Sequence, residues 1–272
     1  MIFDLQTYQQ VWQKLNQSQL IFEVPKLTTI SLYVFEKIPS TNTKLWELID
    51  HGLEIPRGVI ALEQTAGKGQ WGNSWVSSKG GLYLSVALDL DLALKDNSHL
   101  VMATSWGIAK VLRYYQLPVT IKWSNDLILN QRKLGGIKIE TRNEQDRIVK
   151  AVIGIGINWF NTVPDVGINF ESYYQNHGSQ PNIETLEELT AITAYGIFLG
   201  YQYYLTVGIE QLLVNYLKLL NSLGRSITVN DCPGEVIGVT TEGKLKVKLR
   251  SPGASTEINI SPGQMSLGYP NN

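Results

Sequence analysis

The order of apolar and polar residues predicts a long first region in which strands and helices are mixed. β-branched and aromatic residues, or apolar residues at alternate positions, predict strands at residues 30–38, 57–64, 80–90, 119–123, 127–130, 133–142 and 148–158. Helical spacing is found at residues 5–15, 41–51 and 98–115, and twice between 183 and 223. Ser40 or Thr41 could cap the second helix, and Ser98 the third. Residues 161–182 are polar and predict a long loop.

A second pattern begins near Leu223–Arg225. Short strands are predicted there at residues 226–230, 234–240, 244–250 and 256–260, separated by turns rich in Gly, Pro and Asn. This spacing favours a small antiparallel barrel or sandwich. We therefore expect an α+β protein with an N-terminal extension (1–29), a main domain (30–223) and a small β domain (224–272).

Composition excludes several classes of protein. Hydrophobic residues make up 43% of the chain and charged residues 17%, so a large core can be buried. The net charge of −1 argues against a nucleic-acid coat or a binder of anionic membranes. The start of the chain lacks a signal-peptide pattern, and no apolar run approaches the ~18 residues of a membrane span, so a cytoplasmic location is expected.

Cysteine and histidine are too scarce for familiar metal or disulfide chemistry. Cys232 is the single cysteine, which excludes an internal disulfide framework and makes a Cys/His zinc site unexpected. His51, His99 and His177 are expected at the surface or in loops, and none lies near a nucleophile motif.

The loop Glu63–Trp75, "EQTAGKGQWGNSW", combines three glycines, a lysine and two tryptophans. Glycine allows another molecule to approach the backbone closely, and several N–H groups beside Lys68 would form a concave anion site. The alternative is a hairpin turn whose tryptophans cap the core. The glycine spacing matches neither common phosphate-binding loop.

Three further segments carry candidate chemistry, and each has a plain structural alternative. "KWSND" (Lys122–Asp126) supplies a cation, an amide and a carboxylate, or is a polar turn. "KLGGIKIE" (Lys133–Glu140) offers a lysine beside bare backbone, or is a hairpin with a solvated lysine. "GIGIN" (Gly154–Asn158) could border a ligand, or is a thin strand on which a helix packs closely.

Taken in order, "PSTN", the glycine loop, "KWSND", "KLGGIKIE" and "GIGIN" resemble the motifs of biotin–protein ligases, also called biotin–[acetyl-CoA-carboxylase] ligases. The resemblance covers about Phe35–Asn158 and is looser beyond it. It implies a mixed sheet flanked by helices, related to class II aminoacyl-tRNA synthetases, with a C-terminal Src-homology-3-like β-barrel. Regulatory members of the family carry an N-terminal winged helix that binds DNA. Only about thirty residues precede the first predicted strand, so the resemblance implies the monofunctional form, without DNA binding.

The resemblance also implies the reaction. Biotin is activated with ATP to biotinyl-5′-AMP, and biotin is then transferred to a lysine of the biotin carboxyl carrier protein of acetyl-CoA carboxylase. Mg²⁺ is expected to arrive with ATP, without a named protein ligand. No membrane partner is implied, and a homodimer is left open.

Site residues follow from the resemblance, position by position. The catalytic residues implied are Lys133, Lys68 and Asp126. The residues implied at biotin are Ser40, Thr41, Asn42, Gln64, Lys68, Gly69, Gln70, Lys133 and Gly136. Those implied at the nucleotide are Lys68, Trp75, Lys122, Asn125, Asp126 and Asn158, and the backbone of Gly156 lines the cleft.

The glycine loop departs from the family pattern "GRGRxGRxW" at three arginines. Lys68, Gln70 and Asn73 stand at those positions, and Ser124 replaces the usual proline of "KWPND". Lysine cannot bind two phosphate oxygens in a planar fork, and Asn73 carries no charge, so weaker retention of the adenylate is expected. Two alternatives stay open: a lipoate or octanoyl ligase or transferase, and a non-catalytic protein that binds biotin or a nucleotide.

Overall fold

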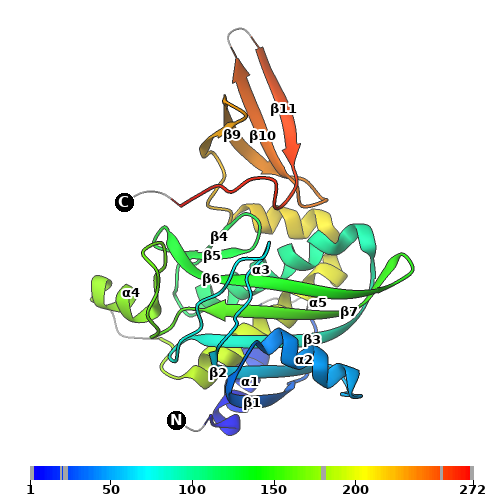
Figure 1. The fold of residues 1–272 in the computed structure, drawn as a ribbon, viewed down its shortest axis with the longest axis vertical. Helices are drawn as coiled ribbons and strands as arrows, with labels where there is room; N and C mark the ends of the chain where they lie inside the picture. The colour runs from blue at the N-terminus through cyan, green and yellow to red at the C-terminus, as the bar shows by residue number, and fades with distance from the viewer. Residues whose placement is uncertain (1–2, 19, 21–23, 179–181, 252–253, 270–272) are drawn as a thin grey trace.

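The main domain is built on a seven-stranded mixed sheet with the strand order β1-β2-β3-β7-β6-β5-β4 (Figure 1). This computed structural model describes residues 3–18, 20, 24–178, 182–251 and 254–269. The strands are β1 Ser31–Ile38, β2 Arg57–Gln64, β3 Leu82–Ala93, β4 Thr120–Lys122, β5 Asp126–Leu129, β6 Arg132–Glu144 and β7 Arg147–Ile157. β1 and β2 are parallel, and the other neighbours are antiparallel. The predicted mixed sheet is confirmed.

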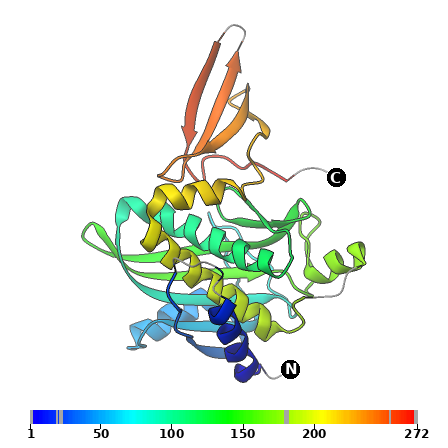
Figure 2. The same ribbon diagram turned by 180° about the vertical axis from the view of Figure 1, so that it is seen from behind.

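Helices cover both faces of this sheet. They are α1 Leu5–Ser18, α2 Thr41–Asp50, α3 Asn97–Tyr114, α4 Phe170–His177 and α5 Leu186–Leu217, and a short 3₁₀ turn, η1 Leu94–Asp96, precedes α3. On one face α3 and α5 pack together, and α1 packs on α5 over the large apolar core (Figure 2). On the other face α2 packs against β2, β3 and β7 over a smaller core. No helix in the described part of the chain is long and apolar enough to cross a membrane.

The structure corrects two predicted details of the helices. Residues 161–182 are not one long loop, because α4 forms within them where Asn169 caps the helix and Phe170 and Tyr174 are buried. Ser98 does not cap α3, because the helix already begins at Asn97 after η1. The prediction of two helices before residue 223 is confirmed, since α5 is interrupted at Gly208, whose φ is 77°.

His99 is not a surface or loop residue as predicted. It lies in α3 with 6% of its surface exposed. Its Nδ1 lies 3.0 Å from the hydroxyl of Tyr204 in α5, and its Nε2 lies 2.9 Å from the carbonyl oxygen of Thr241. The ring therefore connects the helical layer to the C-terminal region. His51 and His177 are exposed near helix ends, as expected.

The C-terminal region forms a four-stranded antiparallel sheet with the order β11-β10-β9-β8. Its strands are β8 Ser226–Val229, β9 Cys232–Val239, β10 Leu245–Ser251 and β11 Ala254–Ile260. This arrangement fits the small Src-homology-3-like domain expected from the sequence. After β11 the chain returns to the main domain near β4 and β5 (Figure 1).

Candidate active site

The sequence motifs converge on one cavity, on the face of the sheet that carries α2. Its volume is about 50 Å³, enough for a few water molecules. It is lined by Ser40, Thr41, Asn42, Gln64, Lys68, Gly69, Gln70, Trp75, Asn125, Asp126, Lys133, Gly136, Ile137, Lys138, Gly154, Ile155 and Gly156. Among the predicted site residues, Lys122 and Asn158 do not line this cavity. Lys122 lies beside Asp126, and Asn158 borders a neighbouring cavity.

A chain of hydrogen bonds fixes the polar end of the cavity. The backbone nitrogen and the hydroxyl of Thr41 donate to Gln64 Oε1, at 2.8 and 3.1 Å. Gln64 Nε2 donates to Ser77 Oγ at 2.8 Å. The fully buried Ser85 donates to Asn42 Oδ1 at 2.6 Å. Asn42 Nδ2 remains a buried donor without a hydrogen-bond partner among the described residues, so a ligand acceptor would remove an energetic cost.

Two glycines of "GIGIN" provide the space for side chains that lie across β7. A Cβ atom on Gly154 would lie 2.1 Å from Asn42 Oδ1, and one on Gly156 would lie 2.3 Å from Trp75 Nε1. A larger residue at either position would displace the side chain that packs there. Gly156 therefore makes room for Trp75 beside the cavity, while Gly154 lets α2 pack closely on β7 through Asn42, so each of the two interpretations of "GIGIN" holds for one glycine.

Ser40 precedes α2 but its side chain makes no capping hydrogen bond. Only 3% of its surface is exposed, and it lines the cavity beside Thr41 and Asn42. The start of α2 therefore brings three short polar side chains to one end of the cavity.

The glycine loop forms a flap, defined here as residues 65–77, that is closed over β6. Gly69 N donates to Asn73 O at 2.7 Å and closes the hairpin. Lys138 Nζ donates to Gly69 O at 3.0 Å, and Gln70 Nε2 donates to Ile137 O at 3.1 Å. The two contacts with β6 join the flap to the sheet.

Residues at which the sequence departs from the family pattern make hydrogen bonds within the protein itself. Lys68 Nζ donates to Thr43 Oγ1 at 2.9 Å and is exposed. Asn73 Nδ2 donates to Gln70 O at 3.0 Å, within the flap. Ser124 follows a cis peptide bond, and its hydroxyl donates to Asn125 Oδ1 at 3.1 Å.

The two tryptophans of the flap do not cap the hydrophobic core. Trp75 lies against Gly136 and Gly156, with its ring centroid 5.3 Å from Lys133 Nζ. Its indole nitrogen is buried and has no hydrogen-bond partner in the described part of the chain. Trp71 is 68% exposed at the tip of the flap. The alternative of a hairpin with core-capping tryptophans is therefore wrong.

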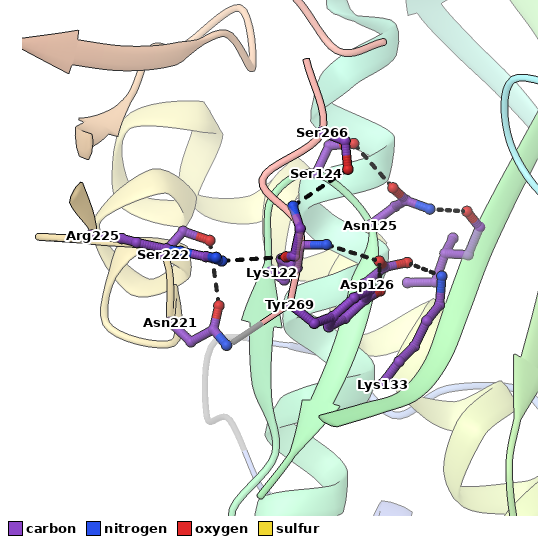
Figure 3. A network of polar contacts seen from close by, with 12 residues as sticks. Lys122, Ser124, Asn125, Asp126, Lys133, Asn221, Ser222, Arg225, Ser266 and Tyr269 are labelled. Carbon is purple, nitrogen blue, oxygen red and sulfur yellow. Dashed lines mark hydrogen bonds and ion pairs between the residues drawn. The ribbon is translucent and has the colours of Figure 1, made fainter. Parts of the chain in front are cut away.

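Charged side chains gather around Asp126 (Figure 3). Lys133 Nζ lies 2.7 Å from Asp126 Oδ1, and Lys122 Nζ lies 3.9 Å from Asp126 Oδ2. The hydroxyl of Tyr269, from the C-terminal segment, donates to Asp126 Oδ2. Burial lowers the pKa of Lys122 to about 8, the positive charges of Lys133 and Arg225 act in the same direction, and Asp126 opposes them.

A second cavity lies on the other side of Trp75 and Lys133. Its volume is about 200 Å³, and it is lined by Ser74, Trp75, Val76, Lys133, Asn158, Asn161, Thr162, Pro164, Val166 and Gly167. Asn158 Nδ2 donates to Lys133 O at 3.2 Å, and Asn161 Nδ2 donates to Asn158 Oδ1 at 3.2 Å. Lys133 therefore lies at the junction of the two cavities.

Several residues of the site were not predicted from the sequence, and four of them, Ser85, Lys138, Ser77 and Tyr269, make polar contacts there. Ser85 is a polar residue inside an otherwise apolar stretch of β3, and Lys138 lies within "KLGGIKIE", so both left a weak signal. Ser77 and Tyr269 left none that we recognise. Tyr269 is 143 residues from the carboxylate that it contacts.

Residues 34–158 match the sequence profile of the Biotin/lipoate A/B protein ligase family. The matched range contains every residue that lines the first cavity. Residues 34–158 are therefore similar to that family. The motifs on which the sequence resemblance depends all lie within this range.

Relatives and solved structures agree with this similarity. The Bifunctional ligase/repressor BirA of Escherichia coli (strain K12) is 36% identical over 148 residues, or 54% of this chain and 45% of that protein. The Biotin--[acetyl-CoA-carboxylase] ligase of Paracoccus denitrificans is 29% identical over 137 residues, or 47% of this chain and 54% of that protein. The chain thus spans about half the length of the curated relatives it matches.

The similarity in fold extends beyond the residues that are matched in sequence. The structure of the biotin protein ligase from Aquifex aeolicus in complex with biotin and ATP superimposes with a TM-score of 0.66 at 20% identity, covering 84% of this chain and 95% of that one. This likeness includes most of the chain, so the overall fold of the two proteins is shared.

Proposed function

We propose that this protein is a biotin–[acetyl-CoA-carboxylase] ligase. A carboxylate oxygen of biotin attacks the α-phosphorus of ATP, the bond to the bridging oxygen breaks, and pyrophosphate leaves with the electron pair. The neutral amine of a carrier lysine then attacks the acyl carbon of biotinyl-5′-AMP. AMP leaves, and the nitrogen loses a proton. The observation that carries the proposal is the position of Lys133. This lysine lines both the first cavity, which has a polar end, and the second cavity beside Trp75.

The first cavity fits the cyclic urea of biotin. Asn42 Nδ2 is a buried donor in need of an acceptor, and a urea carbonyl supplies one. Thr41 and Gln64 add polar groups whose orientation the hydrogen-bond chain sets in advance, and Ser40 adds a buried hydroxyl beside them. Preorganised donors of this kind give specificity because they lose little freedom on binding.

The biotin carboxylate would then meet the α-phosphate at Lys133. Its ammonium group stabilises the negative charge that develops on the phosphate, while Asp126 holds that ammonium in place. Positioning and electrostatic stabilisation supply most of the rate in reactions of this kind, so a strong base is not required. Lys68, Gly69 and Gln70 of the flap offer one further cation and backbone groups to the same region.

The second cavity would receive the nucleotide. Trp75 offers an aromatic wall for the adenine, and Asn158 offers an amide near Lys133. Asn125 and Asp126 border the first cavity close to this junction. Mg²⁺ is expected to arrive with the phosphates of ATP.

Binding requires the flap to move. A volume of about 50 Å³ is far below the ~300 Å³ or more of small-molecule sites, so the bicyclic vitamin does not fit the closed cavity. Few contacts join the flap to β6, so it can open to admit biotin and close again over the adenylate. Closure would exclude water, which hydrolyses a mixed anhydride.

The alternative substrate, lipoate, lacks the urea group. Asn42 Nδ2 would then remain buried and unpaired, and for this reason we favour biotin. A protein that only binds biotin or a nucleotide would not need the Lys133–Asp126 pair at the junction. Competition between biotin and lipoate, and the measurement of AMP, separate these alternatives.

The partner would be a biotin carboxyl carrier protein, in this proposal that of acetyl-CoA carboxylase.

A homodimer is also open. β6 continues to Glu144 but pairs with β5 only from Arg132 to Gly136, which leaves one edge of its second half without a strand partner among the described residues. The absence of DNA binding and the cytoplasmic location stay predictions from the sequence.

The experiment that tests the proposal combines the protein with biotin, ATP labelled at the α-phosphate and a biotin carboxyl carrier domain. We expect AMP to form only when biotin is present, and a blot to show biotin on the carrier. Binding of biotin without AMP would support the non-catalytic alternative. AMP formation with lipoate but not with biotin would overturn the proposed substrate.

A further inference from the structure

The C-terminal segment, residues 261–269, reaches the centre of the candidate active site. Leu267 is buried, and Arg225 Nη1, just before β8, donates to Gly268 O at 3.3 Å, so the segment is fixed in place shortly before Tyr269. Near its start, Gly263 lies under the ring of Trp71, since a Cβ atom there would lie 2.9 Å from the indole. The segment therefore contacts both the flap and the charged cluster.

Tyr269 contacts two members of that cluster at once (Figure 3). Its hydroxyl donates to Asp126 Oδ2, and its ring centroid lies 3.6 Å from Lys122 Nζ. Burial and the charge of Asp126 raise the pKa of Tyr269, so the phenol stays protonated and can only donate to the carboxylate. Each oxygen of Asp126 thus has its own partner, Tyr269 on Oδ2 and Lys133 on Oδ1.

We propose that Tyr269 is a positioning residue for the adenylation step. Its hydroxyl holds Asp126 in the orientation that directs the Lys133 ammonium to the junction of the two cavities. Without the hydroxyl, we expect Asp126 Oδ2 to rotate toward the ammonium of Lys122, which lies 3.9 Å from it. The rotation would weaken the pair with Lys133. This inference rests on the proposed function and adds the C-terminal segment to it.

The variant Tyr269→Phe removes the hydroxyl and keeps the ring over Lys122. We expect kcat for biotin-dependent pyrophosphate release to fall by about tenfold, the effect of losing one hydrogen bond to a charged group. The KM for biotin should change by less than about twofold, because the urea end of the cavity is untouched. Tyr204→Phe is the matched control, since it also loses a hydroxyl hydrogen bond, to His99, outside the site. It should retain the wild-type kcat.

A second measurement does not depend on turnover. Lysines are reductively methylated with ¹³C-formaldehyde, and the Lys122 signal, assigned with a Lys122→Arg variant, is titrated by NMR. The groups that face Lys122 are Asp126, Lys133, Arg225 and the ring of Tyr269. The variant Tyr269→Ala should raise the pKa of Lys122 toward its ordinary value, because the ring no longer keeps water away.

The outcomes separate this inference from the proposed function. An active wild type with an equally active Tyr269→Phe variant would overturn the positioning role alone. A wild type that releases no pyrophosphate would overturn the proposed function and, with it, the role in adenylation. An unchanged Lys122 pKa in Tyr269→Ala would show that the C-terminal segment does not cover the cluster in solution, which also contradicts the inference.

Discussion

Lys133 Nζ lies 2.7 Å from Asp126 Oδ1, and this ion pair joins two neighbouring antiparallel strands, β6 and β5. Both side chains are partly buried, with 26% of Lys133 and 15% of Asp126 exposed. In the antiparallel pairing of β5 and β6, Asp126 lies opposite Gly136. Gly136 has no side chain and follows Lys133 by three residues. The turn between the two strands therefore brings the carboxylate and the ammonium together at the junction of the two cavities.

The close approach of Gly154 to Asn42 predicts a coupled effect of two substitutions. Gly154→Ala should weaken biotin binding by about tenfold or more, because its Cβ would lie 2.1 Å from Asn42 Oδ1 in the present structure. Asn42→Ala should also weaken binding, since the donor for the urea oxygen is lost. In the double variant the cost of Gly154→Ala should shrink, because the displaced side chain is gone. Calorimetric titration with biotin measures all four proteins, and fully additive losses would contradict the steric explanation.

Asn73 stands where the family pattern has an arginine, and this difference predicts poor retention of the intermediate biotinyl-5′-AMP. Asn73→Arg should slow the dissociation of biotinyl-5′-AMP by about tenfold, because a charge-assisted hydrogen bond to phosphate is worth about 1.5–3 kcal/mol. Asn176→Arg adds the same charge on α4, on an exposed residue that does not line either cavity, and serves as the control. Release of radiolabelled adenylate from preloaded protein is timed by filter binding. Equal release rates in wild type and Asn73→Arg would contradict the role assigned to this position.

Much of this candidate site could be predicted from the sequence, because its residues lie in short motifs whose order resembles that of biotin–protein ligases. The motif at Lys122–Asp126 and the glycines of β6 and β7 reach the cavity through local strand pairing, which alternation and turn residues indicate. Tyr269 could not be predicted in the same way. Its position depends on the return of the chain from β11 to the main domain, a long-range contact that leaves no periodic pattern.

The burial of His99 and the formation of α4 were missed for a related reason. A histidine between Tyr204 and Thr241 is satisfied only once α3, α5 and the C-terminal region have packed together. In α4, polar residues dominate the composition, while two aromatic residues supply the burial. Tertiary contacts decided both cases, and single-sequence patterns do not report such contacts.

The closed cavity predicts a movement of Trp75 when ligands bind. Saturating biotin and ATP should change the intrinsic tryptophan fluorescence of the wild type. The reason is that the indole of Trp75 must move from its place against Gly136 and Gly156, or rotate there, to make room for the ligands. The fluorescence change should be largely lost in the Trp75→Phe variant. It should be kept in Trp71→Phe, because the indole of Trp71 in the wild type is mostly exposed at the tip of the flap. An equal change in Trp75→Phe would assign the signal to another of the seven tryptophans and contradict the proposed movement.

The lowered pKa of Lys122 predicts a specific pH dependence of stability. The pKa is about 8 in the folded protein against 10.5 when unperturbed, so the unfolded state binds more protons between these values. The contribution of Lys122 to the free energy of unfolding therefore rises with pH across this window, by about 1–2 kcal/mol after solvent screening. Below about pH 8 both states are protonated, and the folded state bears the full cost of the buried charge.

Urea unfolding of wild type and Lys122→Met between pH 7 and 10 measures this contribution. The difference between the two free energies should move in favour of the wild type as the pH rises. Lys150→Met removes a lysine whose side chain is 38% exposed and should give a constant difference. A constant difference for Lys122→Met as well would mean that its ammonium is not destabilised by burial.

The most direct test of the account is biotin-dependent pyrophosphate release by Lys133→Ala, with Lys79→Ala as a control that removes an exposed lysine paired with Glu36. Lys133 would stabilise charge that develops on the α-phosphate, so its loss should reduce kcat by about 10²–10³-fold. Lys79→Ala should match the wild type, and both variants should keep the wild-type melting temperature to within a few degrees. A Lys133→Ala variant that releases pyrophosphate at the wild-type rate would contradict the central claim, that adenylation occurs at the junction where this lysine lies.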